Sequence, residues 1–153
     1  VPVLNDYGEA IMQAITKHFG NKIPSLVVEP GRGVAGDAGI IEAEVVLISR
    51  KSYDDAVRWV YLDIGRFSGL AETEGEAIRY QFLTERDHEA TGPCILAGPS
   101  CDSADVLYEK RPVALPVGLR AGDRIIIRAC GAYTSSYSSV GFNGFPPLDV
   151  MVI

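Results

Sequence analysis

The sequence SLVVEPGR at residues 25–32 decides the expected fold. Its apolar half is short and is stopped by Pro30 and Gly31, which is typical of a strand buried on both faces, as in a parallel sheet covered by helices. A buried strand of this kind needs neighbouring strands beside it and helices on both faces. The stretch therefore predicts one strand of an α/β domain.

Upstream of this strand, the spacing of apolar residues predicts a helix. Apolar side chains recur every three or four residues between Ala10 and Phe19, Asn5 or Asp6 can cap the helix, and Gly20 can end it. One helix and one strand cannot make an α/β domain by themselves. Residues 1–38 are therefore expected to be the terminal piece of a larger α/β domain.

Downstream, the chain changes to short β-rich runs separated by Gly, Pro, Asp and Ser. One short helix is expected around Gly69–Ile78, with Leu70 and Ala77 facing inward and the three glutamates between them facing outward. Six short strands predict an antiparallel barrel or sandwich over residues 39–153, so the chain is expected to be mainly β. The expected strands are Ile40–Ser49, Val57–Ile64, Tyr80–Thr84, Cys94–Ala97, Asp123–Ala129 and Val150–Ile153.

The composition is that of a soluble globular protein. Hydrophobic residues make up 47% of the chain, and 14 Lys plus Arg against 20 Asp plus Glu give a net charge of −6. An acidic surface argues against nucleic acid as a partner, and the apolar runs are far shorter than the roughly 20 residues of a membrane helix. Three cysteines without disulfide spacing and two histidines without metal-ligand spacing favour a cytoplasmic protein without a zinc site.

Three glycine-flanked clusters carry residues suited to chemistry. The first, Glu29-Pro-Gly-Arg32, ends the expected strand. Its glycine lets the backbone approach a ligand, its arginine offers a fork for phosphate, and its carboxylate can accept a hydrogen bond from a cationic ring nitrogen. Taken alone, the cluster also fits an ordinary turn with a solvated salt bridge.

The second cluster, Gly98-Pro-Ser-Cys-Asp102, places a thiol beside a carboxylate. A neighbouring anion favours the protonated form of a thiol, which suits Cys101 to proton donation rather than to nucleophilic attack. The alternative is a turn in which Asp102 caps the following segment and Cys101 is inert.

The third cluster joins Gly131-Ala-Tyr-Thr134 to Phe142-Asn-Gly-Phe145 shortly afterwards. The hydroxyl of Tyr133 can hold a phosphate oxygen, and Phe142 can form the wall of a substrate pocket. Aromatic residues beside glycine also occur as ordinary barrel packing, so this cluster is not specific by itself.

Together and in this order, the clusters resemble the C-terminal part of the fold-type III pyridoxal-phosphate decarboxylases of basic amino acids, the ornithine/lysine/arginine and diaminopimelate decarboxylase family. Members pair an N-terminal (β/α)8 barrel with a C-terminal β-domain. The resemblance therefore implies that residues 1–38 belong to the barrel and residues 39–153 form the β-domain. It also implies pyridoxal 5′-phosphate as cofactor, a basic amino acid as substrate, and a homodimer with active sites at the subunit interface.

The resemblance implies roles for the residues on the cofactor side. Glu29 would pair with the pyridine nitrogen of the cofactor and keep it protonated. Arg32 and Tyr133 would help to hold the phosphate, with Gly31 allowing the backbone to come close.

Other residues would act on the substrate of the neighbouring subunit. Cys101 would supply a proton to the substrate carbon after carbon dioxide departs, and Asp102 would bind the distal ammonium. Phe142 would line the pocket, and Glu76 would be a second acidic contact to the ammonium. Because diaminopimelate decarboxylases usually carry Glu after the cysteine, Asp102 favours ornithine or lysine, whose diamine products enter polyamine biosynthesis.

No lysine of the chain lies in anything resembling the family's imine-forming motif. The chain alone is therefore expected to be inactive and to need the N-terminal barrel portion of the same enzyme as a partner. The alternative is a non-catalytic β-domain that acts as a binding or regulatory module. A regulator would have no use for the complete set of cofactor and proton-transfer groups, which favours the decarboxylase. The lysines are Lys17, Lys22, Lys51 and Lys110.

Overall fold

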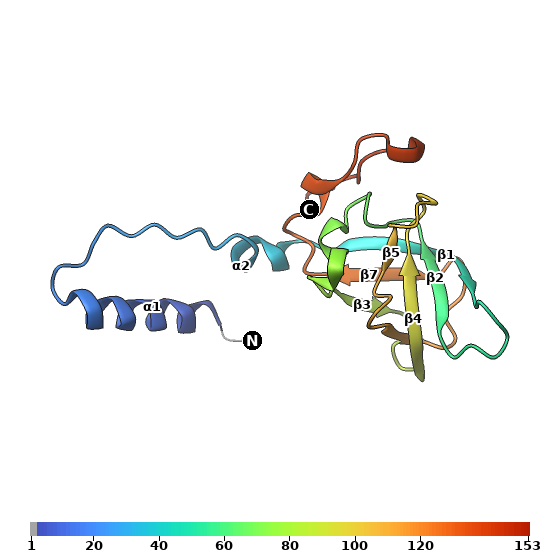
Figure 1. Cartoon of the computed structure of the whole chain (residues 1–153), viewed down its shortest axis with the longest axis horizontal. Coiled ribbons are helices and arrows are strands. Elements are labelled where there is room, and N and C mark those ends of the chain that lie inside the picture. The colour runs from blue at the N-terminus through green and yellow to red at the C-terminus, as the bar shows by residue number, and fades with distance from the viewer. Residues whose placement is uncertain (1–2) are drawn as a thin grey trace.

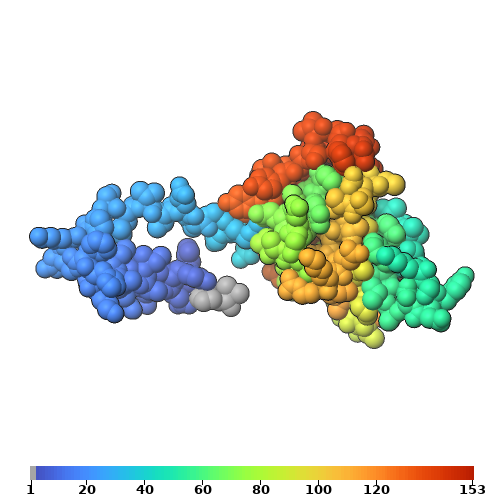
Figure 2. All heavy atoms as spheres, viewed as in Figure 1, coloured from blue at the N-terminus to red at the C-terminus, as the bar shows by residue number. Residues whose placement is uncertain are grey.

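The structure, a computed structural model, describes residues 3–153 and consists of a helix that stands apart from a curled β-domain (Figure 1). Helix α1, Leu4–Phe19, is joined to the β-domain by an extended segment without regular structure. Figure 2 shows the same division in the space-filling view, where the N-terminal lobe is connected to the β-domain only through this segment. No helix within residues 3–153 combines the length and the apolar character needed to cross a bilayer.

Helix α1 forms over the predicted residues, with a different cap. Val3 is the N-cap residue, and its N–H donates to Asp6 Oδ2 at 3.0 Å, so Asp6 caps the helix from inside the first turn. Gly20 ends the helix as expected, with φ of 56° and an N–H that donates to Thr16 O at 2.9 Å. The helix buries no residue, so its apolar side chains face solvent in this chain.

The strand expected at residues 25–29 does not form. Residues 22–30 have no regular structure, and Val27 and Val28 are 87% and 71% exposed. A strand of a parallel sheet exists only when another strand accepts its hydrogen bonds, and none of the described strands pairs with this segment. Within this chain the apolar run is therefore an extended, exposed segment.

The β-domain is a single seven-stranded sheet in the order β3-β7-β1-β2-β4-β5, with β6 also paired to β4. The sheet curls on itself into a half-barrel (Figure 1), which confirms the expected mainly β fold. All pairs are antiparallel except β2 with β4, which run parallel. A parallel pair needs a long crossover, and the chain between β2 and β4 supplies it by passing through β3 at the far edge of the sheet. The strands are β1 Ile41–Ser49, β2 Arg58–Leu62, β3 Gln81–Thr84, β4 Thr91–Ala97, β5 Val106–Leu107, β6 Val113–Pro116 and β7 Arg124–Arg128.

Five of the six expected strands are present, and the sixth is wrong. Val150–Ile153 has no regular structure and is exposed, because no strand of the sheet pairs with it. The short strands β5 and β6 were not expected, since one has only two residues and the other ends in proline.

The core lies inside the curl and follows from strand alternation. In β1, Ile41, Ala43 and Val45 are buried while Glu42 between them is exposed. Strands β2 and β7 repeat the pattern, and Leu70 adds to the core from the segment between β2 and β3. The sheet thus fixes the loops at its ends, where the predicted site residues lie.

Candidate functional site

Gly31 and Tyr133, separated by about a hundred residues in the sequence, come together at one end of the sheet. Gly31 has a φ of +51°, and a Cβ at this position would lie 2.8 Å from the hydroxyl oxygen of Tyr133. The position therefore requires glycine on two counts, backbone conformation and space. Arg32 follows directly, with its guanidinium carbon 5.6 Å from the centroid of the Tyr133 ring. The structure thus groups three of the four residues predicted for the cofactor.

A tight junction behind these residues fixes their positions. The short helices α2 (Arg32–Ala35) and η1 (Gly36–Ala38) lie against the chain that follows β7. Gly131 N–H donates to Gly36 O at 2.9 Å, and Cys130 N–H donates to Gly39 O at 2.8 Å. A Cβ on Gly131 would overlap the backbone of α2. Glycine at this contact lets the two backbones touch, and this sets the distance between Arg32 and Tyr133.

The positive charge of Arg32 is neutralised by Glu72, a residue that was expected to face outward. Its guanidinium forms an ion pair with Glu72, from the 3₁₀ helix η2 (Ala71–Glu76), and both side chains are partly buried. Tyr80 lies beside the same guanidinium. Burial raises the pKa of Tyr80, and the positive charge of Arg32 opposes that rise. Glu72 and Tyr80 therefore complete the surroundings of Arg32.

The fourth predicted cofactor residue, Glu29, is not held in the same way. It lies in the extended segment before Gly31, and its side chain is exposed. The segment that carries it is the one whose strand did not form, so no regular structure within residues 3–153 fixes the position of Glu29.

The second group of predicted residues lies on the loop that follows β4. Cys101 is exposed and has a φ of +60°, a left-handed conformation that non-glycine residues rarely adopt. Asp102 is partly buried, and its Oδ1 accepts the N–H of Ala104 at 2.8 Å. The thiol and the carboxylate therefore belong to consecutive residues of a loop whose backbone is held by a side-chain hydrogen bond.

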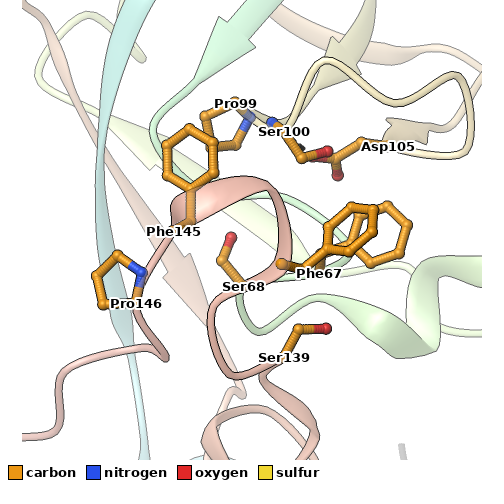
Figure 3. Close-up of a pocket in the computed structure, with 9 residues that line it drawn as sticks. Phe67, Ser68, Pro99, Ser100, Asp105, Ser139, Phe145 and Pro146 are labelled. Carbon is orange, nitrogen blue, oxygen red and sulfur yellow. Dashed lines mark hydrogen bonds between the residues drawn. The ribbon is translucent and has the colours of Figure 1, made fainter.

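Phe142 and Asn143 join this loop from the C-terminal segment. Asn143 Nδ2 donates to Ser100 O at 2.7 Å, and the rings of Phe142 and Phe67 stack with centroids 4.3 Å apart. A small pocket lies at this contact (Figure 3). It is lined by residues of the loop after β4, by Phe67 and Ser68, and by residues of the C-terminal segment. The segment that carries Phe142 is thus tied to the loop that carries Cys101, and the role of Phe142 in lining a substrate pocket stays a prediction.

Glu76 is placed differently from its predicted role. Its Oε1 accepts the N–H groups of Lys110 and Arg111 at 2.8 and 3.0 Å, and its Oε2 accepts Arg111 Nε at 2.9 Å and Arg79 Nη1 at 3.1 Å. Burial acts to raise the pKa of this carboxyl, but the hydrogen bonds from Arg111 and Lys110 outweigh it and hold the pKa below its ordinary value. A carboxylate occupied by four donors has no capacity left for an ammonium group, so Glu76 is a clamp for the fold rather than a substrate contact.

The short helix expected around Gly69–Ile78, with Leu70 and Ala77 facing inward, is only partly correct. Leu70 is fully buried as predicted, but Ala77 is exposed and Glu76 is 8% exposed. The helix is not a continuous one, because it kinks at Glu74 and Gly75, and Gly75 has a φ of 60°. The kink turns the Glu76 carboxylate inward toward the chain at 110–111.

Asp105 is a residue of this region that sequence reasoning missed. It is 2% exposed, and its carboxylate accepts the N–H of Arg66 at 2.6 Å and the hydroxyl of Ser100 at 2.6 Å. Aspartate in a polar loop is normally solvated, and nothing in the local sequence marks this one as buried.

The structure thus combines a mainly β domain, an arginine and a tyrosine at a close backbone approach, and an exposed thiol next to a partly buried carboxylate on another loop. The family model described as pyridoxal-dependent decarboxylase, C-terminal sheet domain, matches residues 11–131. The chain belongs to this family.

Several curated relatives are similar over most of the chain. Diaminopimelate decarboxylase of Staphylococcus aureus is 30% identical over 136 residues, which are 89% of this chain and 31% of the relative. Lysine/ornithine decarboxylase of Selenomonas ruminantium is 34% identical over 142 residues, 89% of this chain and 33% of that protein. The chain thus spans about a third of the length of these relatives.

A solved structure with the same fold is the lysine/ornithine decarboxylase of Vibrio vulnificus complexed with cadaverine. It superposes with a TM-score of 0.77 at 28% identity, covering 97% of this chain and 38% of that one. The arginine decarboxylase of Paramecium bursaria Chlorella virus, bound to agmatine, gives a TM-score of 0.76 at 28% identity, covering 95% of this chain and 39% of that one.

Proposed function

We propose that this chain is the C-terminal portion of a pyridoxal-phosphate-dependent decarboxylase that releases carbon dioxide from lysine or ornithine. The observation that carries the proposal is the loop at Cys101 and Asp102, which presents a thiol and a carboxylate together on a fixed backbone. An amino-acid decarboxylase needs a proton donor for the carbon that loses carbon dioxide and an anion for the far ammonium. The two side chains supply one of each.

The residues around Arg32 fit the phosphate end of the cofactor. Gly31 leaves the backbone open, the Tyr133 hydroxyl lies directly over it, and the Arg32 guanidinium is adjacent. Because a guanidinium has five donors, Arg32 can keep its ion pair with Glu72 and still donate to a phosphate oxygen. Arg32 and Tyr133 would therefore hold the phosphate, and Glu29 would accept a hydrogen bond from the ring nitrogen. When bound, the cofactor supplies an electron sink for the departure of carbon dioxide.

The substrate side would be served by the other loop. Asp102 keeps one carboxylate oxygen free of the Ala104 N–H, which leaves it able to accept from an ammonium group. Cys101 would deliver its proton to the substrate α-carbon, and Phe142 would exclude water from the aliphatic part. Because Cys101 is exposed, its thiol could reach the active site of a second subunit in a homodimer.

The remaining part of the enzyme would be an N-terminal barrel portion. Helix α1 exposes Leu4, Tyr7, Ile11, Met12 and Phe19, and the segment after it exposes Val27 and Val28. An apolar helix face and an unpaired extended segment are what a piece of a (β/α)8 barrel would show without its neighbours. We accordingly assign residues 1–38 to the barrel and residues 39–153 to the β-domain, although α2 packs on the latter, and expect no activity from this chain alone.

The test is an activity assay of the whole enzyme with three substrates. The barrel portion joined to this chain is incubated with lysine, ornithine and diaminopimelate, and carbon dioxide release is measured for each. Release from lysine or ornithine supports the proposal, and exclusive release from diaminopimelate, the substrate named for several relatives, would overturn the substrate choice. Release from none of the three, with cofactor bound or not, would favour the non-catalytic alternative.

Replacing Cys101 with Ala separates the proton donor from the cofactor site. The variant C101A is expected to bind the cofactor as the unmodified enzyme does, because Arg32 and Tyr133 are untouched. Its turnover should fall by about a hundredfold, within the range for loss of a general acid, or its product should be altered by protonation elsewhere. Unchanged turnover and product would remove Cys101 from the mechanism.

A further inference from the structure

The loop that carries Cys101 and Asp102 is held from both sides while the thiol itself stays exposed. On the near side, Ser100 is bonded at its N–H, its hydroxyl and its carbonyl. On the far side, the carbonyl of Asp102 accepts the N–H of Asp105 at 2.9 Å. The left-handed φ of Cys101 lies between these two fixed points, and such a conformation persists only where its surroundings determine it.

Most of these bonds lead to Asp105. Its Oδ2 accepts the Ser100 hydroxyl at 2.6 Å and the Ser100 N–H at 3.2 Å, and its Oδ1 accepts the Arg66 N–H at 2.6 Å. Its carbonyl accepts the N–H of Gly98 at 2.9 Å. The buried carboxylate of Asp105 therefore holds the middle of the loop at Ser100, while its backbone carbonyl and N–H hold the start at Gly98 and the end at Asp102.

The space around Asp105 is shaped to keep it there. A Cβ on Gly65 or on Gly98 would overlap its carboxylate, so both positions accept only glycine while Asp105 is in place. Arg66, whose N–H binds the carboxylate, also anchors its guanidinium on Val106 O at 2.8 Å. The carboxylate is thus enclosed by backbone and receives charge-assisted hydrogen bonds, which are stronger than those between neutral groups.

We propose that Asp105 is the positioning residue of this site, which holds Cys101 and Asp102 in the orientation needed to act on the substrate without touching the substrate itself. This inference rests on the proposed function, since it assigns Asp105 a task in the same reaction. Asn143, which donates to Ser100 O at 2.7 Å, ties the Phe142 segment to the loop that Asp105 fixes.

The test uses Asp105→Asn in the whole enzyme, with Asp123→Asn as the matched control. Asp123 also binds a turn through its carboxylate, accepting the Arg120 N–H at 2.9 Å, but it does so beside β7 and Arg86. Turnover is measured per cofactor-loaded site, so that loss of folded protein does not count. D105N is expected to lower kcat by about tenfold or more with cofactor affinity unchanged, and D123N to leave kcat within about twofold.

Amide hydrogen exchange gives a second readout that needs no turnover. D105N should raise exchange across residues 98–105 by about tenfold or more, and D123N should raise it only around residues 120–123. If D105N does not fold, Ser100→Ala removes a single bond to Asp105 and should show both effects in weaker form. Normal exchange in the loop of a folded D105N, or raised exchange with an unchanged kcat, would overturn the inference. An unmodified enzyme that releases no carbon dioxide overturns the proposed function instead, and exchange then decides whether Asp105 fixes the loop.

Discussion

Tyr108 directly follows β5, and the hydrogen bonds of its buried phenol join this position to the segment before β3. It is 1% exposed, its hydroxyl donates to Ile78 O at 3.2 Å, and it accepts the N–H of Tyr80 at 3.1 Å. Burial raises the pKa of Tyr108 to about 12, and the hydrogen bond from Tyr80 only partly offsets this. The folded protein therefore favours the neutral phenol.

This gives a prediction about alkaline pH. A group whose folded pKa lies above its unfolded value stabilises the fold fully below the unfolded pKa, near 10, and loses that contribution as pH rises toward 12. The titration of Tyr108 should by itself lower the free energy of unfolding by up to about 2–3 kcal/mol across this window. Urea unfolding at several pH values between 8 and 12 measures it.

The control is Tyr108→Phe, which removes the titrating hydroxyl and keeps the ring. The variant should be less stable at neutral pH, because the N–H of Tyr80 loses its partner, but its stability should fall less steeply above pH 10. The stability of the variant should still fall with pH from about pH 9, although less than that of the unmodified protein. The reason is that burial also raises the pKa of Cys130, to about 11. Parallel curves for the two proteins would contradict the assignment.

At the scale of elements, Glu76 joins the 3₁₀ segment Ala71–Glu76 to the chain at residues 110–111. Its carboxylate takes hydrogen bonds from Lys110, Arg111 and Arg79. These bonds hold the pKa of Glu76 below its ordinary value, so its stabilising effect is present above pH 4.5 and is lost as pH falls below that value. The same segment carries Glu72, the ion-pair partner of Arg32.

Glu76→Gln should therefore lower the midpoint of urea unfolding at pH 7 and flatten its decline below pH 4.5. The amide can still accept hydrogen bonds through one oxygen, but it loses the charge that strengthens them. Glu74→Gln is the matched control, because Glu74 lies in the same segment with an exposed side chain and should leave the midpoint unchanged. Equal effects of the two variants would show that Glu76 is not the clamp.

The elements that were predicted from the sequence are those whose pattern depends only on residues close together in the chain. In β1 the alternation of Ile41, Glu42 and Ala43 specifies which face is buried, and this needs only neighbouring residues. The strand at residues 25–29 was wrong for the opposite reason, since its formation depends on partner strands that this chain does not supply.

Residues with distant partners were the hardest to predict. Arg58 is 6% exposed because its Nη2 donates to Leu115 O and Pro116 O, both at 2.9 Å, from the unexpected strand β6. The Glu76 carboxylate is likewise used by residues more than thirty positions away. Motif reasoning named Arg32 and Tyr133 together, and the two side chains do lie close to each other, but the partners of the buried charged groups could be found only from the structure.

At the scale of the whole molecule, α1 stands apart from the β-domain within residues 3–153 (Figure 1). None of its residues is buried, and Leu4, Tyr7 and Ile11 lie along one face at helical spacing. A helix of 16 residues without tertiary contacts is only marginally stable in water, so its amides should exchange much faster than those of β1 or β7 when this chain is expressed alone. The barrel portion should protect them on binding.

The apolar face of α1 is predicted to be the surface that the barrel portion covers. Ile11→Asp places a charge on that face and should weaken binding of a separately expressed barrel portion by at least about tenfold, measured by titration calorimetry. Gln13→Asp puts the same residue on the opposite face of the helix, with the same cost in helix propensity, and should leave the affinity nearly unchanged. Because α1 buries nothing against the sheet, neither variant should shift the unfolding midpoint of the β-domain, which separates lost association from lost folding. Equal affinities for the two variants would mean that the barrel portion meets this chain elsewhere, with the extended segment at residues 22–30 as the next surface to test.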